Sequence, residues 1–175
     1  MEFFEVLRQR RSVRSYRNQP VEDEKLKRIF EAANLAPSAG NLQAYQVRVI
    51  QDEVKRKALA RAAHDQGYIA QAPVCLVFFA DAQRSAEKYG KRGAELYSVQ
   101  DATIAGSFAM LAAVDVGLAT VWVGDFEEKE VQKILETETL RPVAMFSLGY
   151  AGEQPSPSPR RAIEEIFSGD YPQTD

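Results

Sequence analysis

The chain has 175 residues, of which 45% are hydrophobic and 27% charged, and its net charge is −3. This composition is typical of one folded domain with its own core, and no apolar run reaches the roughly 18–20 residues that a membrane span needs. The mild acidity argues against general affinity for nucleic acid. One cysteine and one histidine exclude an internal disulfide and a His/Cys zinc site within one chain.

The first residues lack the pattern of a targeting segment. No hydrophobic stretch follows the basic cluster near the N-terminus, as it would in a signal peptide. Glu2 and Glu5 are unusual for a transit peptide, because such peptides are poor in acidic residues. Together with the single cysteine, these features favour a cytoplasmic protein.

Two helical segments are expected before residue 37. Phe3, Phe4 and Leu7 recur at helical spacing in a short amphipathic segment. Residues 22–36 are predicted to form a helix, because acidic residues fill its first turn and an apolar stripe follows. Pro37 ends this helix.

The next three segments are predicted to form strand, helix and strand. Residues 43–50 alternate enough to form a strand, and residues 52 to about 64 form a basic, mostly exposed helix. Residues 74–80 are an almost unbroken apolar run, which is typical of a central strand covered on both faces. Cys75 lies in this run and is expected to be an inert buried thiol.

Residues 93–116 are predicted to form the longest helix, roughly 36 Å at 1.5 Å per residue. Its inward positions are all small: Ala102, Ala105, Gly106, Ala109, Ala112 and Ala113. Small residues let another element approach closely. This segment is therefore either a central core helix or a subunit interface.

Two further strands are expected at 118–123 and 142–148, with a helix near 127–136 between them. Helices and strands are mixed, and their crossovers are irregular. This pattern predicts a single α+β layered domain rather than a doubly wound sheet. We assign residues 1–167 to this domain and residues 168–175 to a polar C-terminal tail.

The most informative segment is 10–14, which reads Arg-Arg-Ser-Val-Arg. With Arg8 and Arg17, it places five arginines within ten residues of an acidic protein. Guanidinium forks beside a serine hydroxyl supply the charge and the donors that a dianionic phosphate needs. Arg8 and Arg17 themselves are expected to be ordinary surface residues.

Three other segments suit the binding of a small cofactor. The turn-rich loop 36–43 offers backbone amides and polar side chains, and the strand 121–126 contains a glycine that allows close backbone approach. Arg160 and Arg161 return positive charge late in the chain, after a proline-rich connector.

Catalytic side chains are scarce. His64 is expected to lie exposed on a helix, and Asp101 is expected to be a helix-start or buried structural acid. The chain has no GxxxxGKS phosphate loop and no GxGxxG after a strand. An enzyme with so few catalytic groups is expected to take its reactivity from a cofactor.

In this order and spacing, the four segments resemble the FMN-dependent nitroreductase family over nearly the whole chain. The resemblance extends to residues 20–26, 100–102 and 149–150. It implies a nitroreductase-like α+β fold with a mainly antiparallel sheet flanked by helices. It also implies a homodimer formed through the long helix, with FMN in each of two interfacial clefts. The activity it implies is ping-pong hydride transfer from NAD(P)H through FMN to nitroaromatic, quinone or related acceptors.

The resemblance also assigns site residues. It places Arg10, Ser12 and Arg160 on the FMN phosphate, with Arg11 beside them. It places Arg14 at the pyrimidine edge, where a fixed cation stabilises reduced flavin. The other implied cofactor contacts are Pro37, Ser38, Ala39, Asn41 and Gln43, across the dimer interface, and Gln66, Trp122, Val123, Gly124 and Arg161.

Several alternatives stay open. Trp122 is either a flavin neighbour or an ordinary core residue. A protein of the same fold and cofactor can instead dehalogenate, desaturate or cleave the flavin, and a basic N-terminal arm can bind a polyanion without catalysis. The sequence names neither the electron acceptor nor a preference between NADH and NADPH.

Overall fold

The computed structural model describes residues 1–169, so residues 170–175 of the predicted tail lie outside the described part of the chain. The helices are α1 (Phe3–Gln9), α2 (Asp23–Asn34), α3 (Glu53–Ala62), α4 (Tyr68–Gln71), α5 (Ala82–Arg92), α6 (Ser98–Asp115) and α7 (Glu128–Ile134). The strands are β1 (Tyr45–Ile50), β2 (Val74–Ala80), β3 (Ala119–Val123) and β4 (Arg141–Gly149). Short 3-10 turns form η1 (Ala39–Asn41) and η3 (Ile163–Glu165), and η2 (Gly93–Tyr97) is a π-helical turn.

The four strands form one antiparallel sheet in the order β1-β2-β4-β3. Tyr45 of β1 pairs with Ala80 of β2, and Ala119 of β3 pairs with Gly149 of β4. The predicted antiparallel sheet of an α+β domain is thereby confirmed. The strands β2 and β4 lie in the middle, and almost all of their residues are buried.

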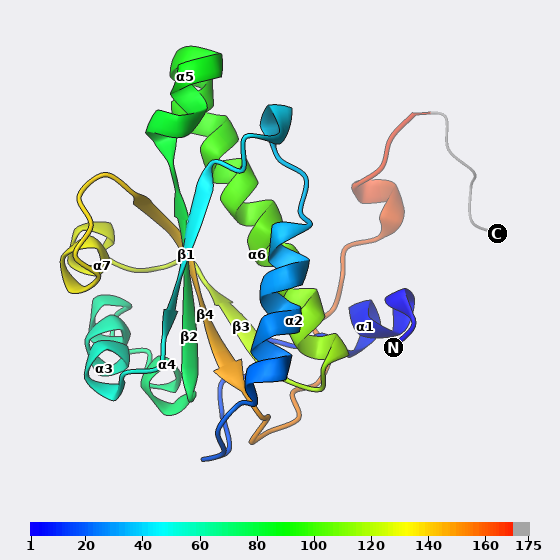
Figure 1. Ribbon diagram of the computed structural model, residues 1–175. Coiled ribbons are helices and arrows are strands. Elements are labelled where there is room, and N and C mark those ends of the chain that lie inside the picture. The colour runs from blue at the N-terminus through cyan, green and yellow to red at the C-terminus, as the bar shows by residue number, and fades with distance from the viewer. Residues whose placement is uncertain (170–175) are drawn as a thin grey trace.

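Helices cover both faces of this sheet (Figure 1). On one face, α2 and α6 pack over Phe78 and Phe146. On the other, α3, α4 and α7 enclose a second cluster that includes Leu59 and Met145. The whole of β2 is buried, as its unbroken apolar run predicts, and Cys75 is fully enclosed within it.

The small residues of the long helix serve the core of this chain. Five of the six are buried against the sheet and α2. A Cβ built on Gly106 would lie 2.9 Å from Cζ of Phe146, so α6 approaches β4 too closely for a larger residue there. This packing favours the interpretation of these residues as part of a central core helix, and the dimer interface through the long helix stays a prediction. On α6, Phe108 is exposed, at 39%, and Ile104, Met110 and Leu111 are partly accessible.

Other differences from the sequence prediction concern helix ends and short helices. The helix α3 ends at Ala62, so His64 lies exposed in the following turn with φ of 55° rather than on the helix. The helices α4 and α5 are not expected from the sequence pattern. Apart from its buried Ser85, α5 is partly or fully exposed, so it lacks the apolar stripe that reveals a helix. Within residues 1–169, the structure contains no helix that is both long and apolar enough to span a membrane.

Candidate functional site

The arginine cluster lines a cavity of about 520 Å³ that joins the two ends of the described chain. One wall comes from the segment after α1 and the other from the proline-rich connector after β4. The lining residues are Leu7, Arg8, Arg10, Arg11, Ser12, Arg14, Pro155, Ser156, Pro157, Ser158 and Arg160. The structure thus brings Arg160 to the N-terminal arginines, and it places Arg8 in the cavity, where we had expected only an ordinary surface residue.

The backbone of the cluster is fixed against the edge of the sheet. Ser12 forms a parallel bridge with Thr120 of β3, and the Val13 amide donates to the Thr120 carbonyl at 3.2 Å. Tyr16 is buried, and its hydroxyl donates to the carbonyl of Val13 at 2.8 Å. The backbone amide of Tyr16 donates to Oε1 of Gln71 at 3.1 Å. These bonds hold the segment extended, so that successive side chains point to opposite faces. Arg10, Ser12 and Arg14 therefore share one face, and the buried Val13 lies on the other.

Like charges gather in this cavity. Burial, and then the neighbouring charges of Arg160 and Arg11, lower the pKa of the Arg10 guanidinium below its usual value. Arg11 also donates to the carbonyls of Arg8 and of Arg10, the latter at 2.8 Å, at the end of α1. Crowded half-buried guanidiniums are stabilised by an anion between them, so the cavity fits a phosphate group.

One acidic side chain reaches the same segment. Oε1 of Glu153 accepts a hydrogen bond from the Arg14 backbone amide at 2.6 Å, while the Arg14 side chain is exposed. Glu153 could not be predicted as part of the site, because nothing in its local sequence links it to a residue 139 positions earlier. It pins the end of the cluster and leaves the Arg14 guanidinium accessible.

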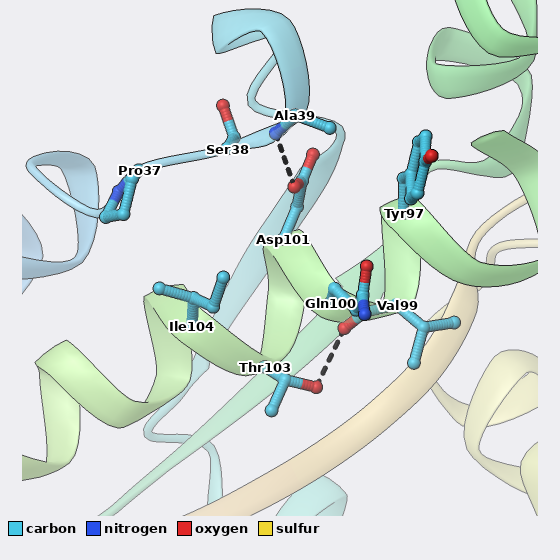
Figure 2. Close-up of a pocket in the computed structure, with 9 residues that line it drawn as sticks. All are labelled: Pro37, Ser38, Ala39, Tyr97, Val99, Gln100, Asp101, Thr103 and Ile104. Carbon is cyan, nitrogen blue, oxygen red and sulfur yellow. Dashed lines mark hydrogen bonds between the residues drawn. The ribbon is translucent and has the colours of Figure 1, made fainter. Parts of the chain in front are cut away.

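A second cavity, of about 530 Å³, lies where the loop before η1 meets the start of α6 (Figure 2). The loop contributes Pro37, Ser38 and Ala39. The helical side contributes Tyr97, Val99, Gln100, Asp101, Thr103 and Ile104. The two cavities share no lining residue, and in Figure 1 η1 lies near the start of α6, far from α1.

Asp101 holds this loop in shape. It is only 2% exposed, and its carboxylate accepts from the Ala39 amide at 2.9 Å and from the Ala44 amide at 3.3 Å. Figure 2 shows Asp101 reaching from α6 to Ala39. Within the loop, Oγ of Ser38 accepts from the Gln43 amide at 2.9 Å. The prediction that Asp101 is a buried structural acid is confirmed.

Backbone strain concentrates in the loop 36–43 and in the turn just before Gln66. Asn41 and Gln43 have φ of 56° and 49°, and His64 and Asp65 have φ of 55° and 58°. Among residues 1–169, one other non-glycine residue, Glu136, has positive φ. Strained backbone of this kind persists where surrounding structure imposes it, and it clusters at functional sites.

The side chains of Gln43 and Gln66 lie apart from both cavities. Nε2 of Gln43 donates to Oδ1 of Asn34 at 3.3 Å. Nε2 of Gln66 donates to the carbonyl of Asp125 at 3.3 Å, next to Gly124. Gln66 therefore lies beside the exposed glycine segment that follows β3.

The remaining predicted residues have structural partners. Trp122 packs against Phe146 with ring centroids 4.9 Å apart and belongs to the core under α6, which favours the core alternative. Val123 is buried in the opposite core. Arg161 forms an ion pair with Glu165 at 3.0 Å and does not line the arginine cavity.

Tyr97 is a cavity residue that the sequence analysis missed. A signal for it exists, because Tyr97, Asp101 and Ile104 follow the 3–4 residue spacing of one helix face. The π-helical turn η2 keeps Tyr97 in line with α6. The same spacing therefore brings its ring to the cavity beside Asp101 (Figure 2).

Comparisons with a family profile, with related sequences and with solved structures all find similar proteins. The chain matches the profile of the Nitroreductase family over residues 7–68 and 65–150. It is 32% identical to an FMN reductase [NAD(P)H] of Bacillus subtilis over 94% of this chain and 72% of that one. It is 30% identical to an NADH dehydrogenase of Thermus thermophilus over 90% of both chains. It also resembles the structure of the NADPH:FMN oxidoreductase of Vibrio harveyi in complex with NAD+, with a TM-score of 0.88 and 27% identity over 98% of this chain and 78% of that one.

Proposed function

This chain belongs to the nitroreductase family, and on that premise we propose that it is an FMN-dependent NAD(P)H oxidoreductase. When bound, FMN would supply ping-pong hydride transfer from NAD(P)H to a nitroaromatic, quinone or related acceptor. The protein's own residues bind and orient the cofactor and the two successive reactants. The single buried cysteine fits a cytoplasmic location, which we propose with it.

The observation that carries this proposal is the crowding of Arg10, Arg11 and Arg160 around one cavity, with Ser12 beside them. Such a set meets the needs of a phosphate monoester: several cations, planar donor forks and one neutral hydroxyl. We assign the FMN phosphate to this cavity. Arg14 is accessible at one end of the row, and we assign it to the pyrimidine edge of the ring, where its fixed charge stabilises the reduced cofactor.

We further propose that the active unit is a homodimer. The loop residues Pro37, Ser38 and Ala39 line a cavity separate from the arginines, so in this proposal each cofactor lies between the arginines of one subunit and the loop of its partner. Exposed aromatic side chains support an interface around α1, with Phe3 at 61% and Phe4 at 67% exposure. Exposed apolar residues near η3 support it too, and η3 stands clear of the domain on the same side as α1 (Figure 1).

The central experiment measures FMN binding. Purified protein should be yellow and should release FMN on denaturation. Arg10→Ala should raise the Kd for FMN at least about tenfold, because one charge-assisted contact to phosphate is lost. Arg17→Ala is the matched control, since Arg17 is exposed and lies outside the cavity. Colourless protein that cannot be reconstituted with FMN, or equal effects of the two substitutions, would refute the assignment.

Three further measurements test the role of Arg14, the reaction type and the dimer. Arg14→Ala should make the reduction potential of bound FMN more negative, because the reduced cofactor loses a neighbouring cation. Anaerobic NADH or NADPH should bleach the flavin, and air should restore its absorption. Irreversible loss of the chromophore would instead indicate an enzyme that consumes its flavin. Phe4→Glu should shift the protein from dimer to monomer in sedimentation, because an exposed apolar contact becomes charged.

A further inference from the structure

The helical segment α5–η2 forms a small basic and aromatic cap next to the loop cavity. Four basic side chains and one acidic side chain occur in α5, within a protein of net charge −3. The segment bends at Gly90, whose φ of 55° and ψ of −142° break the helix. In Figure 1, α5 stands at the end of the molecule where α6 begins. Positive charge is therefore concentrated at one rim of the site.

Two tyrosines line this cap. The rings of Tyr89 and Tyr97 meet edge to face, with centroids 5.2 Å apart. Tyr97 also lines the loop cavity, as Figure 2 shows. The Tyr89 hydroxyl lies so close to Gly40 that a Cβ on that glycine would clash with it. The two rings thus connect the cap to the loop that we assign to the cofactor.

A cation lies over each of these rings. Nζ of Lys88 is 5.3 Å from the centroid of Tyr89, and Cζ of Arg92 is 5.4 Å from the centroid of Tyr97. Nε of Arg92 also donates to the Tyr97 hydroxyl at 2.9 Å. Lys91, between them in sequence, instead forms an ion pair with Glu95 at 3.7 Å.

Lys88 and Arg92 are both exposed cations. Within residues 1–169, no acidic side chain lies within ion-pair distance of either of them. A Cβ on Gly40 would lie 2.7 Å from Nζ of Lys88, so this charge sits directly over the loop. An anionic group of a ligand held at the loop can therefore meet Lys88 without displacing an existing ion pair, and Arg92 lies against Tyr97 of the same cavity.

The chemistry of the electron donor matches this arrangement. NADH and NADPH differ by one phosphate, on the 2′ oxygen of the adenosine. Arginine and lysine recognise such a dianion, and aromatic faces stack on a purine base. We propose that Lys88 and Arg92, each set over a tyrosine beside the loop cavity, bind the adenosine 2′-phosphate of NADPH, so that the enzyme prefers NADPH to NADH. This inference rests on the proposed function, because it places the donor over the bound cofactor.

The kinetic test compares the two donors in the FMN-loaded protein. Lys88→Ala and Arg92→Ala should each lower the ratio of kcat/KM for NADPH to kcat/KM for NADH about tenfold. Lys91→Ala is the matched control, since its charge is already paired, and it should leave the ratio within about twofold. A ratio that stays constant in Lys88→Ala and Arg92→Ala, or that falls as far in Lys91→Ala, would overturn the proposal.

A binding test avoids turnover altogether. In calorimetric titrations of the FMN-loaded protein, adenosine 2′,5′-bisphosphate should bind at least about tenfold more tightly than ADP, and the double variant K88A/R92A should lose this advantage. Equal affinities in the wild-type protein would overturn the inference. So would an advantage that survives in the double variant.

The two proposals fail in different ways. If neither NADH nor NADPH bleaches the flavin, the proposed oxidoreductase function fails, and the bisphosphate titration still measures the site. If both donors bleach the flavin with equal efficiency, only the 2′-phosphate site fails. Lys88 donates no hydrogen bond within the described chain, so Lys88→Ala tests the charge even if Arg92→Ala disturbs Tyr97.

Discussion

Replacement of Asp101 by asparagine should destabilise the protein and loosen the loop before η1. The carboxylate accepts from the amides of Ala39 and Ala44, at 2.9 and 3.3 Å, and is 2% exposed. Asparagine keeps one acceptor oxygen, and its NH2 group must then face the other amide. One buried donor is left unpaired, at about 1–3 kcal/mol, and the retained bond loses its ionic character.

We estimate a loss of about 3 kcal/mol in the free energy of unfolding from these two effects. For a chain of this size, that corresponds to a decrease in Tm of roughly 6–12 °C. Urea denaturation and calorimetry of the FMN-free protein measure both quantities. The Kd for FMN should rise as well, because Asp101 orders the loop from which Ala39 lines the cavity.

The matched control is Asp125→Asn. Its side chain is 89% exposed, and its one ion pair is with His64, at 3.3 Å. A surface pair of this kind contributes little, so the change in stability should stay within about 0.5 kcal/mol. If Asp101→Asn is as mild as this control, or if it weakens stability without any effect on FMN binding, the role assigned to Asp101 is wrong.

Three other predictions concern the core and the N-terminus. Gly106→Ala should lower the free energy of unfolding by about 1–3 kcal/mol in urea denaturation, because the new Cβ would lie 2.9 Å from Phe146; an unchanged stability would refute this close packing. Burial raises the pKa of the Cys75 thiol to about 12, so a thiol reagent at pH 8 should label it only after unfolding; rapid labelling of the native protein would contradict that burial. The hydrogen bond from Met1 to Asp115 raises the pKa of the amino terminus above 8.0, so its stabilisation is present below pH 8 and is lost as pH rises through the folded value. Denaturation midpoints between pH 7 and 10 should therefore fall more in the wild type than in Asp115→Asn, and parallel curves would refute the contact.

Individual elements show which parts of the fold can be predicted from neighbouring residues alone. The strand β2 and the amphipathic helix α2 begin and end within two residues of their predicted limits. Their burial pattern and their ends depend on residues that are close together in the sequence, so both can be predicted from it. In contrast, α5 buries only Ser85 and carries no periodic apolar signal. Its place depends on the bend at Gly90 and on contacts with η2, which no local pattern specifies.

The candidate site also contains residues that local sequence predicts and residues that it does not. The row Arg10, Ser12 and Arg14 could be predicted from sequence as an anion site, because charge and spacing alone identify it. That Arg160 joins it, and that Glu153 pins its end, depends on the chain returning from β4 to the N-terminus. Contacts between residues so far apart in the sequence cannot be recognised from a local pattern.

The amino-acid sequence by itself determined that this protein is an α+β domain with an anion-binding arginine row and a buried acid at the start of its long helix. Periodicity, charge and helix-end signals act over a few residues and can be recognised without a structure. Only the tertiary structure decided that the small residues of α6 serve the core and that the arginines and the loop line separate cavities. It also decided that two cations without an ion-pair partner among residues 1–169 lie over tyrosines beside the loop cavity. The physical reason is that packing and long-range electrostatics depend on which distant segments meet, and folding alone brings them together.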